Sequence, residues 1–268
     1  MEDPCSYLDE VRSIAEEAGR CILDVYEHDF AVEEKQDGSP LTEADHAAHE
    51  LIVARLRKLT PDIPILSEEA AATDYKKRAD WQRFWLVDPL DGTKEFVDRN
   101  GEFTVNIALI DGSRPVLGVV YVPVPGLSYF ACNGGGAFKQ KGGRERRQIK
   151  ARRYEGDKPI VAASRSHAGG KLAEFLERIG EHDIVRMGSA LKFCLVAEGT
   201  ADIYPRLGPT MEWDTAAAQC IVEEAGGRVV DLDNHPLAYN RPSLLNPWFV
   251  VTGSGDHDWS AYLPPAEE

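Results

Sequence analysis

The sequence has no apolar run long enough to span a membrane, and its N-terminus lacks the basic start and apolar centre of a signal peptide. Both absences point to the cytoplasm, and a peripheral association with the inner face of the cell membrane stays open. The chain also has no surplus of positive charge. Its formal net charge of −15 at pH 7 argues against binding to a nucleic-acid polymer, whose phosphates attract basic side chains.

Cysteine pairs of the C-x-x-C type are absent as well. The five cysteines are Cys5, Cys21, Cys132, Cys194 and Cys220. Of these, Cys21, Cys194 and Cys220 fall in apolar helical patterns, so we interpret them as small buried hydrophobic residues in a reducing compartment. The sequence therefore predicts no disulfide and no cysteine-bound metal.

A stretch that the sequence does contain is Trp85-Leu86-Val87-Asp88-Pro89-Leu90-Asp91-Gly92-Thr93, where an apolar strand leads into a turn with two carboxylates. Pro89 cannot donate to a ladder and predicts that the strand ends near Asp88. Gly92 permits a tight bend, and Thr93 suits the start of a short helix. Two acids beside a helix N-terminus indicate metal-assisted phosphate chemistry, because Mg²⁺ prefers oxygen ligands and often shares its site with phosphate. The alternative is an acidic turn without a ligand.

The predicted elements divide the chain into two halves. The first contains helices over 7–26 and after Thr42, and strands that include 63–66, 103–110, 116–122, 127–131 and 136–139. From about residue 159, strands and helices alternate, which is typical of an α/β arrangement. We predict one compact catalytic unit, with an N-terminal α+β half at 1–146 and a C-terminal α/β half at 147–268.

The run Asp88-Pro89-Leu90-Asp91-Gly92-Thr93 resembles the first signature of the inositol-monophosphatase superfamily of Mg²⁺-dependent, lithium-sensitive phosphatases. Trp213-Asp214-Thr215-Ala216-Ala217, followed by Glu224-Ala225-Gly226-Gly227, resembles the second. Segments at 66–69, 94–96, 100–106, 164–167, 188–194 and 204–206 are most similar to the bacterial 3'(2'),5'-bisphosphate nucleotidases, the CysQ type. The likeness runs from about residue 8 to residue 252 and implies a layered αβαβα sandwich with the active site between the two halves.

The resemblance also implies roles for particular residues. The ligands of two or three Mg²⁺ ions would be Glu68, Asp88, the carbonyl of Leu90, Asp91 and Asp214, with Glu69 as a candidate further ligand. Asp45 and Thr93 would orient and deprotonate the attacking water. Contacts to the substrate would come from Glu68, Leu90, Asp91, Gly92, Thr93, His167, Ser189, Lys192, Arg206 and Asp214.

Several of these residues also have a plain structural interpretation. Asp45 and Asp214 lie in first turns of predicted helices, where an acid caps the helix or matches its dipole. Glu68 and Glu69 follow a short strand, where adjacent glutamates are commonly surface charge. His46 and His49 do not match a zinc motif, and we interpret both as solvated.

The resemblance favours adenosine 3',5'-bisphosphate as the substrate, hydrolysed to AMP and phosphate, with its 5'-phosphosulfate form as a second substrate. Such an enzyme would clear a by-product of sulfate assimilation. One alternative is an inositol or sugar monophosphate phosphatase, for which Lys192 and Arg206 would matter little. Another is an inactive metal-binding module, against which the complete set of acids argues. The sequence does not specify an oligomeric state.

Overall fold

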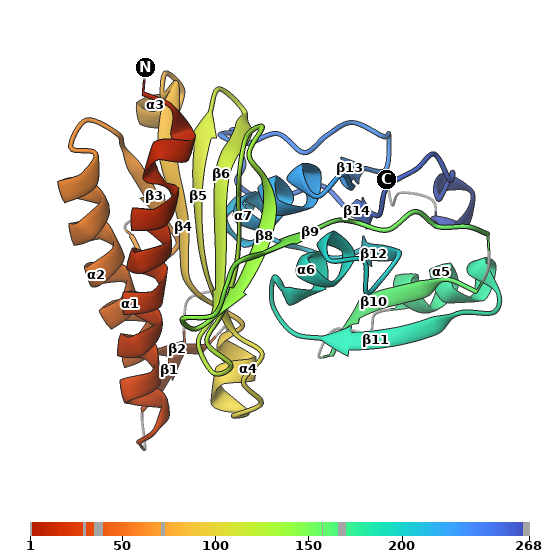
Figure 1. Ribbon diagram of the computed structural model, residues 1–268, viewed down its shortest axis with the longest axis horizontal. Helices are drawn as coiled ribbons and strands as arrows, with labels where there is room; N and C mark the ends of the chain where they lie inside the picture. Colours follow the sequence, from red (N-terminus) through yellow and green to blue (C-terminus); the bar gives the residue numbers. More distant parts are fainter. Residues whose placement is uncertain are drawn as a thin grey trace.

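The computed structural model describes residues 2–28, 31–34, 40–70, 73–156, 158–165 and 170–264. Its elements form five layers (Figure 1). Two helices cover the outer face of a seven-stranded sheet, two more lie between this sheet and a five-stranded sheet, and one covers the far side. The outer helices are α1 (Leu8–Tyr26) and α2 (Glu43–Leu59). The helices between the sheets are α6 (Leu191–Ala197) and α7 (Glu212–Glu224), and the helix on the far side is α5 (Gly170–Ile179). This confirms the predicted αβαβα sandwich.

The seven strands of the larger sheet follow one another in chain order. They are β3 (Ile65–Ser67), β4 (Arg83–Asp91), β5 (Thr104–Asp111), β6 (Arg114–Val122), β7 (Leu127–Cys132), β8 (Gly136–Lys141) and β9 (Arg147–Ile149). Only the pair β3 and β4 is parallel. The sequence did not predict β9, which begins at the proposed boundary between the halves and pairs with β8. The division into halves at that point stays a prediction.

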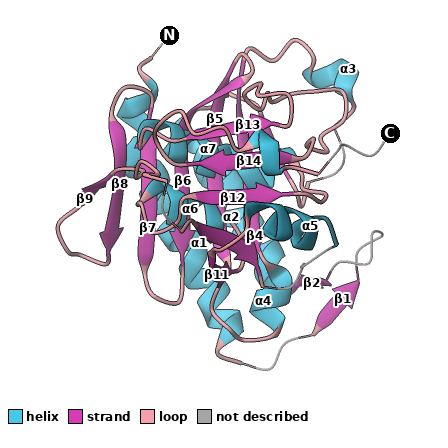
Figure 2. Ribbon diagram, turned by 90° about the vertical axis from the view of Figure 1, so that its right-hand side faces the viewer, coloured by secondary structure: helices cyan, strands magenta, loops and turns pink. Residues whose placement is uncertain are grey.

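The smaller sheet has the order β11-β10-β12-β14-β13, and Figure 2 shows it with α5 in front. Its strands are β10 (Ile160–Ser164), β11 (Asp183–Met187), β12 (Ile203–Arg206), β13 (Arg228–Asp231) and β14 (Phe249–Thr252). Strands β11, β10 and β12 are parallel, so their carboxyl ends share one edge. Polar loops that follow these strands therefore gather at that edge.

The remaining elements are short. They are η1 (Pro4–Tyr7), β1 (Val32–Glu34), β2 (Pro40–Thr42), α3 (Tyr75–Arg78), α4 (Thr93–Val97) and η2 (Ser260–Tyr262). The pair β1 and β2 lies beside α4 (Figure 2). Within the described ranges, no helix combines the length and apolarity needed to cross a bilayer.

Strand β4 is longer than predicted. It continues through Pro89 to Asp91 instead of ending near Asp88. The ladder with β5 shifts register between Asp88 and Asp91. Because the regular pairing is interrupted there, the missing N–H of Pro89 removes no ladder hydrogen bond. The irregularity places both aspartates at the end of a strand that is otherwise buried.

Helix α7 packs very closely against the larger sheet. A Cβ atom on Gly118 of β6 would lie 2.2 Å from the carbonyl oxygen of Ala217, so no larger residue fits there without movement. Alanines at 216–218 make the facing surface of the helix equally small. This contact fixes the helix whose first turn carries Asp214.

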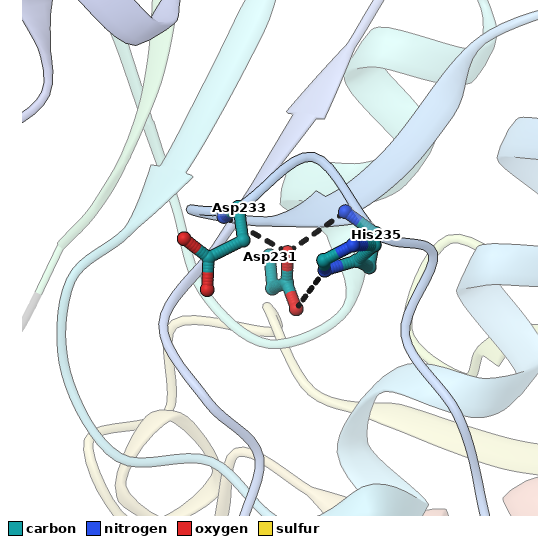
Figure 3. Close-up of side chains that lie close together, drawn as sticks. All are labelled: Asp231, Asp233 and His235. Carbon is teal, nitrogen blue, oxygen red and sulfur yellow. Dashed lines mark hydrogen bonds and ion pairs between the residues drawn. The ribbon is translucent and has the colours of Figure 1, made fainter.

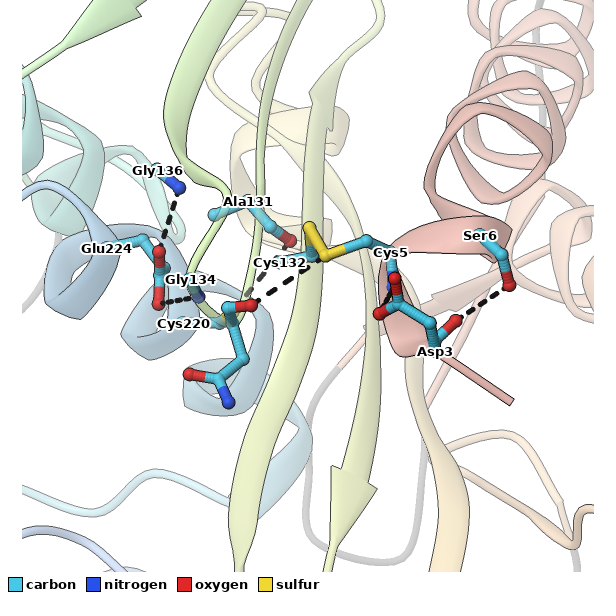
Figure 4. The surroundings of a disulfide bond; sticks show 10 residues. Asp3, Cys5, Ser6, Ala131, Cys132, Gly134, Gly136, Cys220 and Glu224 are labelled. Carbon is cyan, nitrogen blue, oxygen red and sulfur yellow. Dashed lines mark hydrogen bonds between the residues drawn. A yellow bond between two sulfur atoms is a disulfide. The ribbon is translucent and has the colours of Figure 1, made fainter. Parts of the chain in front are cut away.

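The prediction that the chain has no disulfide was wrong. Cys5 in η1 and Cys132 at the end of β7 are joined, with their Cα atoms 5.4 Å apart, as Figure 4 shows. The two residues are separated by 127 positions, and a pairing over that distance depends on the tertiary fold, which a spacing pattern does not reveal. Cys194 and Cys220 are free and buried as predicted, whereas Cys21 is partly exposed.

Candidate active site

A pocket of about 570 Å³ opens where the two halves of the molecule meet. It brings together residues from the ends of β3, β4, β10 and β12 and from the starts of α4, α6 and α7. The predicted site residues that line it are Glu68, Asp91, Gly92, Thr93, Ser189, Lys192, Arg206 and Asp214. Of the other predicted substrate contacts, His167 lies outside the described residues and Leu90 is buried beneath the turn.

Three carboxylates converge beside this pocket. Glu68, Asp88 and Asp214 each offer an oxygen, and these oxygens all lie within 4.8 Å of one another. Burial, together with the negative charges of Asp91 and Glu68, raises the pKa of Asp214 well above its usual range. Like charges this close repel one another unless a cation or a proton neutralises them. A set of carboxylate oxygens fits a hard divalent cation such as Mg²⁺.

Asp91 is held from both halves of the chain. Its Oδ2 accepts hydrogen bonds from the hydroxyl of Ser189 at 2.6 Å and from the backbone N–H of Ala190 at 2.7 Å. Thr104 and Asn106 on β5 add longer contacts to the same oxygen, at 3.4 and 3.3 Å. Ser189, predicted to contact the substrate, thus also contacts a predicted metal ligand.

The sequence interpretation gave no role to Thr104 or Asn106. Both side chains are buried, and the two residues lie opposite Asp91 and Asp88 in the ladder between β4 and β5. Positions two apart on a strand point to the same face. Two polar residues on one face of an otherwise apolar strand were a signal that this part of β5 faces a polar site.

Asp45 uses its two carboxylate oxygens in different ways. Oδ2 accepts hydrogen bonds from the backbone N–H and the hydroxyl of Thr42, at 2.8 and 2.7 Å, and so caps α2. Oδ1 faces the hydroxyl of Thr93 at 3.5 Å, which is long for a hydrogen bond. The capping interpretation is correct, and the same side chain also reaches the turn after β4.

The turn after β4 depends on Gly92, which has φ of +91°. Glycine adopts this left-handed conformation without steric cost. It occupies the N-cap position of α4, so Thr93 becomes the first residue of that helix. The backbone N–H groups of this turn therefore lie at the pocket wall, close to Asp91.

Two cationic side chains, Lys192 and Arg206, also line the pocket, and together they are called the basic wall below. Lys192 is 6% exposed, donates to the backbone oxygen of Ser189 at 2.7 Å and lies 5.4 Å from the centre of the Tyr204 ring. Burial lowers the pKa of Lys192 to about 8. Arg206 donates to the oxygen of Pro209 at 2.6 Å, and its buried Nε has no hydrogen-bond partner in the described part of the chain.

The two histidines of α2 differ from each other. His46 is exposed, as predicted. His49 is half-buried, and its Nδ1 lies 2.8 Å from the hydroxyl of Ser67, the residue before Glu68. Burial lowers the pKa of His49. The prediction of a solvated side chain was therefore wrong for His49, because α2 packs against the end of β3. Glu69, the next acid along, is not among the residues that line the pocket.

A second group of metal-binding residue types lies away from this pocket (Figure 3). Asp231, Asp233 and His235 occupy the turn after β13. One oxygen of Asp231 accepts the backbone N–H groups of Asp233 and His235, at 3.0 and 2.8 Å. None of the three lines the pocket described above. These hydrogen bonds close a surface turn, and we assign the group a structural role.

The layered fold and the acid-lined pocket at its centre define a class of metal-assisted phosphatase, and the chain belongs to the inositol monophosphatase family, whose model matches residues 6–252. It is 52% identical over 248 residues to the 3'(2'),5'-bisphosphate nucleotidase CysQ of Escherichia coli strain K12, which covers 91% of this chain and 99% of that protein. The CysQ protein of Haemophilus influenzae is 36% identical over 255 residues, which is 94% of each chain.

Solved structures agree with these relatives. CysQ from Bacteroides thetaiotaomicron has a TM-score of 0.81 and 43% identity, covering 92% of this chain and 97% of that one. The IMPase of Thermotoga maritima has a TM-score of 0.75 and 26% identity, covering 91% of both chains. The predicted resemblance to the superfamily and to its CysQ type is confirmed.

Proposed function

We propose that this protein is a Mg²⁺-dependent phosphatase that removes the 3'-phosphate of adenosine 3',5'-bisphosphate, giving AMP and phosphate. One observation carries the proposal: a single pocket is lined both by carboxylates and by the cations Lys192 and Arg206. This arrangement suits a ligand with two phosphates, one at a metal centre and one at the basic wall. The names of the CysQ relatives support the same substrate class.

The residues present fit the metal that this family uses. Glu68, Asp88, Asp91, Asp214 and the carbonyl of Leu90 would hold two or three Mg²⁺ ions, with Glu69 as a candidate further ligand. Burial and the charges of Asp91 and Glu68 raise the pKa of Asp214, and a divalent cation would offset the repulsion among these carboxylates. Bound Mg²⁺ supplies positive charge to the phosphate oxygens and lowers the pKa of water.

The chain's own groups would orient the reactants. Oδ1 of Asp45 and the hydroxyl of Thr93 lie 3.5 Å apart and would hold the attacking water, with Asp45 accepting its proton. The N–H groups of Gly92 and Thr93 would bind phosphate oxygens. The water would attack phosphorus in line with the 3'-oxygen, the bond between phosphorus and that oxygen would break, and the leaving oxygen would take a proton from solvent water, so no phosphorylated enzyme intermediate is needed.

The remaining predicted contacts concern the rest of the nucleotide. Lys192 and Arg206 would bind the second phosphate, and Ser189 would contact the nucleotide from the pocket wall while it holds Asp91. His167 is assigned to the nucleotide by resemblance alone. The 5'-phosphosulfate form would fit the same basic wall. We place the reaction in the cytoplasm, where it would clear a by-product of sulfate assimilation.

The test compares two substrates in variants of the basic wall. Lys192→Gln and Arg206→Gln should each lower the ratio of kcat/KM for adenosine 3',5'-bisphosphate to that for inositol 1-phosphate by about tenfold or more, because hydrogen bonds to charged groups contribute about 1.5–3 kcal/mol. Arg228→Gln, an exposed change outside this pocket, is the matched control. An unchanged ratio in both wall variants would favour an inositol or sugar monophosphate phosphatase instead.

A further inference from the structure

The segment Tyr239–Asn246 received no role from the sequence, yet it wraps the start of α7. The backbone N–H groups of Asn240 and Arg241 donate to the carboxylate of Glu212, at 2.8 and 3.1 Å. In return, the N–H of Glu212 donates to the oxygen of Leu244 at 2.8 Å. Glu212 is fully buried. The segment and the first turn of α7 therefore form one hydrogen-bonded unit.

The backbone on both sides of Leu245 is fixed within this unit. Asn246, which is buried, donates to the oxygen of Met211 at 2.8 Å and to the hydroxyl of Thr215 at 3.1 Å. The guanidinium of Arg241 donates to the oxygen of Leu245 itself at 2.6 Å. Leu245 also forms a backbone bridge with Met211. The backbone position of Leu245 is thus set by the same helix start that carries Asp214.

The side chain of Leu245 is nevertheless open to water. It is 47% exposed, an unusual degree for a large apolar residue of this protein, and it lines the pocket of the active site. Covering such a side chain removes apolar surface from water and is favourable. An exposed leucine that lines a pocket on a fixed backbone indicates a contact for an apolar part of the ligand.

The proposed reaction already assigns a part of the substrate to most charged groups of the pocket. The metal ions held by the carboxylates would bind the phosphate that is removed, and Lys192 and Arg206 would bind the second phosphate. Among the other residues that line the pocket, Met211, Trp213 and Leu245 are apolar and belong to the start of α7 and the segment bonded to it. The ribose and the base are the parts of a nucleoside bisphosphate that remain, and the flat faces of the base are the part that packs well against apolar and aromatic side chains.

We infer that Leu245, held by Arg241 and Asn246, contacts the nucleobase and is a specificity-determining residue of this site. The inference rests on the proposed function and deepens it, because it explains how a nucleotide is distinguished from another compound with two phosphates. Leu245 acts here through packing against the substrate. Arg241 and Asn246 are positioning residues that act through Leu245.

The experiment compares adenosine 3',5'-bisphosphate with 1,4-anhydroribitol 3,5-bisphosphate, which keeps the ring and both phosphates but has no base. The wild-type protein should prefer the nucleotide in kcat/KM. In Leu245→Ala this preference should fall by about tenfold, equivalent to about 1.4 kcal/mol, mainly through KM for the nucleotide. Leu245→Met keeps a large apolar side chain and should keep the preference. Val124→Ala, a change at an equally exposed residue outside the pocket, is the control.

The outcomes separate this inference from the proposed function. A wild-type preference for inositol 1-phosphate over adenosine 3',5'-bisphosphate would overturn both. A nucleotide-preferring protein whose Leu245→Ala variant keeps the full preference over the base-free compound would overturn only the role of Leu245. Equal rates of the wild-type protein on the nucleotide and the base-free compound would also overturn only the role of Leu245. The thermal midpoint of each variant verifies that it is folded.

Discussion

Four donors converge on one oxygen of Asp91, from Ser189, Ala190, Thr104 and Asn106. Thr104 and Asn106 lie on β5 of the larger sheet, whereas Ser189 and Ala190 lie between β11 of the smaller sheet and α6. The orientation of this carboxylate therefore depends on how the two sheets are placed against each other. A carboxylate with one oxygen held by hydrogen bonds has its other oxygen available for a metal. At the residue scale, the proposed metal centre therefore depends on these hydrogen-bond donors as much as on the acids themselves.

Ser189→Ala tests this support. The change removes a hydrogen bond to a charged group, worth about 1.5–3 kcal/mol, so the Mg²⁺ concentration for half-maximal activity should rise by about tenfold or more. Titration of activity with Mg²⁺ at saturating substrate measures it. Thr104→Ser retains a hydroxyl and should stay close to the wild-type value. A raised KM for the nucleotide with an unchanged Mg²⁺ requirement would show instead that Ser189 serves the substrate alone.

The charge of Lys192 predicts how kcat/KM for the bisphosphate depends on pH. Burial lowers its pKa to about 8, so the side chain is cationic below that pH and loses its charge as the pH rises through it. If its charge binds the second phosphate, kcat/KM for the bisphosphate should decline above about pH 8. In Lys192→Arg the guanidinium keeps its charge, and the decline should move to higher pH. The same decline in both proteins would exclude Lys192 as its source.

At the scale of elements, the close contact between α7 and β6 is the most sensitive feature. In Gly118→Ala the new Cβ would lie 2.2 Å from the oxygen of Ala217, which forces the helix and the sheet apart. We expect a loss of stability of about 3 kcal/mol, in the upper range for overpacking. Chemical denaturation measures it. Gly143→Ala is the control, since nothing lies within 4 Å of its added Cβ, and equal stability of the two variants would contradict the argument.

Most long elements were predictable from the sequence, whereas some short ones, such as β9, were not. The apolar spacing of Val11, Ile14, Ala18 and Ile22 indicated α1, and all four are fully buried. By contrast, β9 covers only three residues within a highly charged stretch, where no apolar alternation can be recognised. Strand β4 passed through Pro89 because the register shift there removed the ladder bond that proline cannot make.

The disulfide acts at the scale of the whole molecule. It joins η1 to the end of β7 across 127 positions, and closing such a long loop restricts the unfolded chain, with a typical stabilisation of about 2–4 kcal/mol. Cys5→Ser should lower the thermal midpoint, and dithiothreitol should lower that of the wild-type protein to a similar value. Cys21→Ser, which changes a free thiol, should leave the midpoint close to wild type. A midpoint insensitive to both treatments would contradict this stabilising role.

Residues of the site were predictable from the sequence only where they belong to a local motif. The strand-end acids Glu68 and Asp91 could be identified because turn chemistry and family signatures occur within a few consecutive residues. Thr104, by contrast, meets Asp91 across a strand pair, and Leu245 reaches the pocket from a loop near the end of the chain. The first contact forms when β4 pairs with β5, and the second when the late loop packs beside the pocket. The spacing of Thr104 and Asn106 indicated a polar face but did not identify the residue that each one meets.

The central claim is that this pocket hydrolyses a nucleoside bisphosphate with the help of bound Mg²⁺. The most direct test measures phosphate release with Mg²⁺ from adenosine 3',5'-bisphosphate and from inositol 1-phosphate, side by side, with and without EDTA. The account predicts a strong preference for the nucleotide that EDTA abolishes. A preference for inositol 1-phosphate would contradict the assignment of Lys192 and Arg206, and activity that survives EDTA would contradict the metal centre itself.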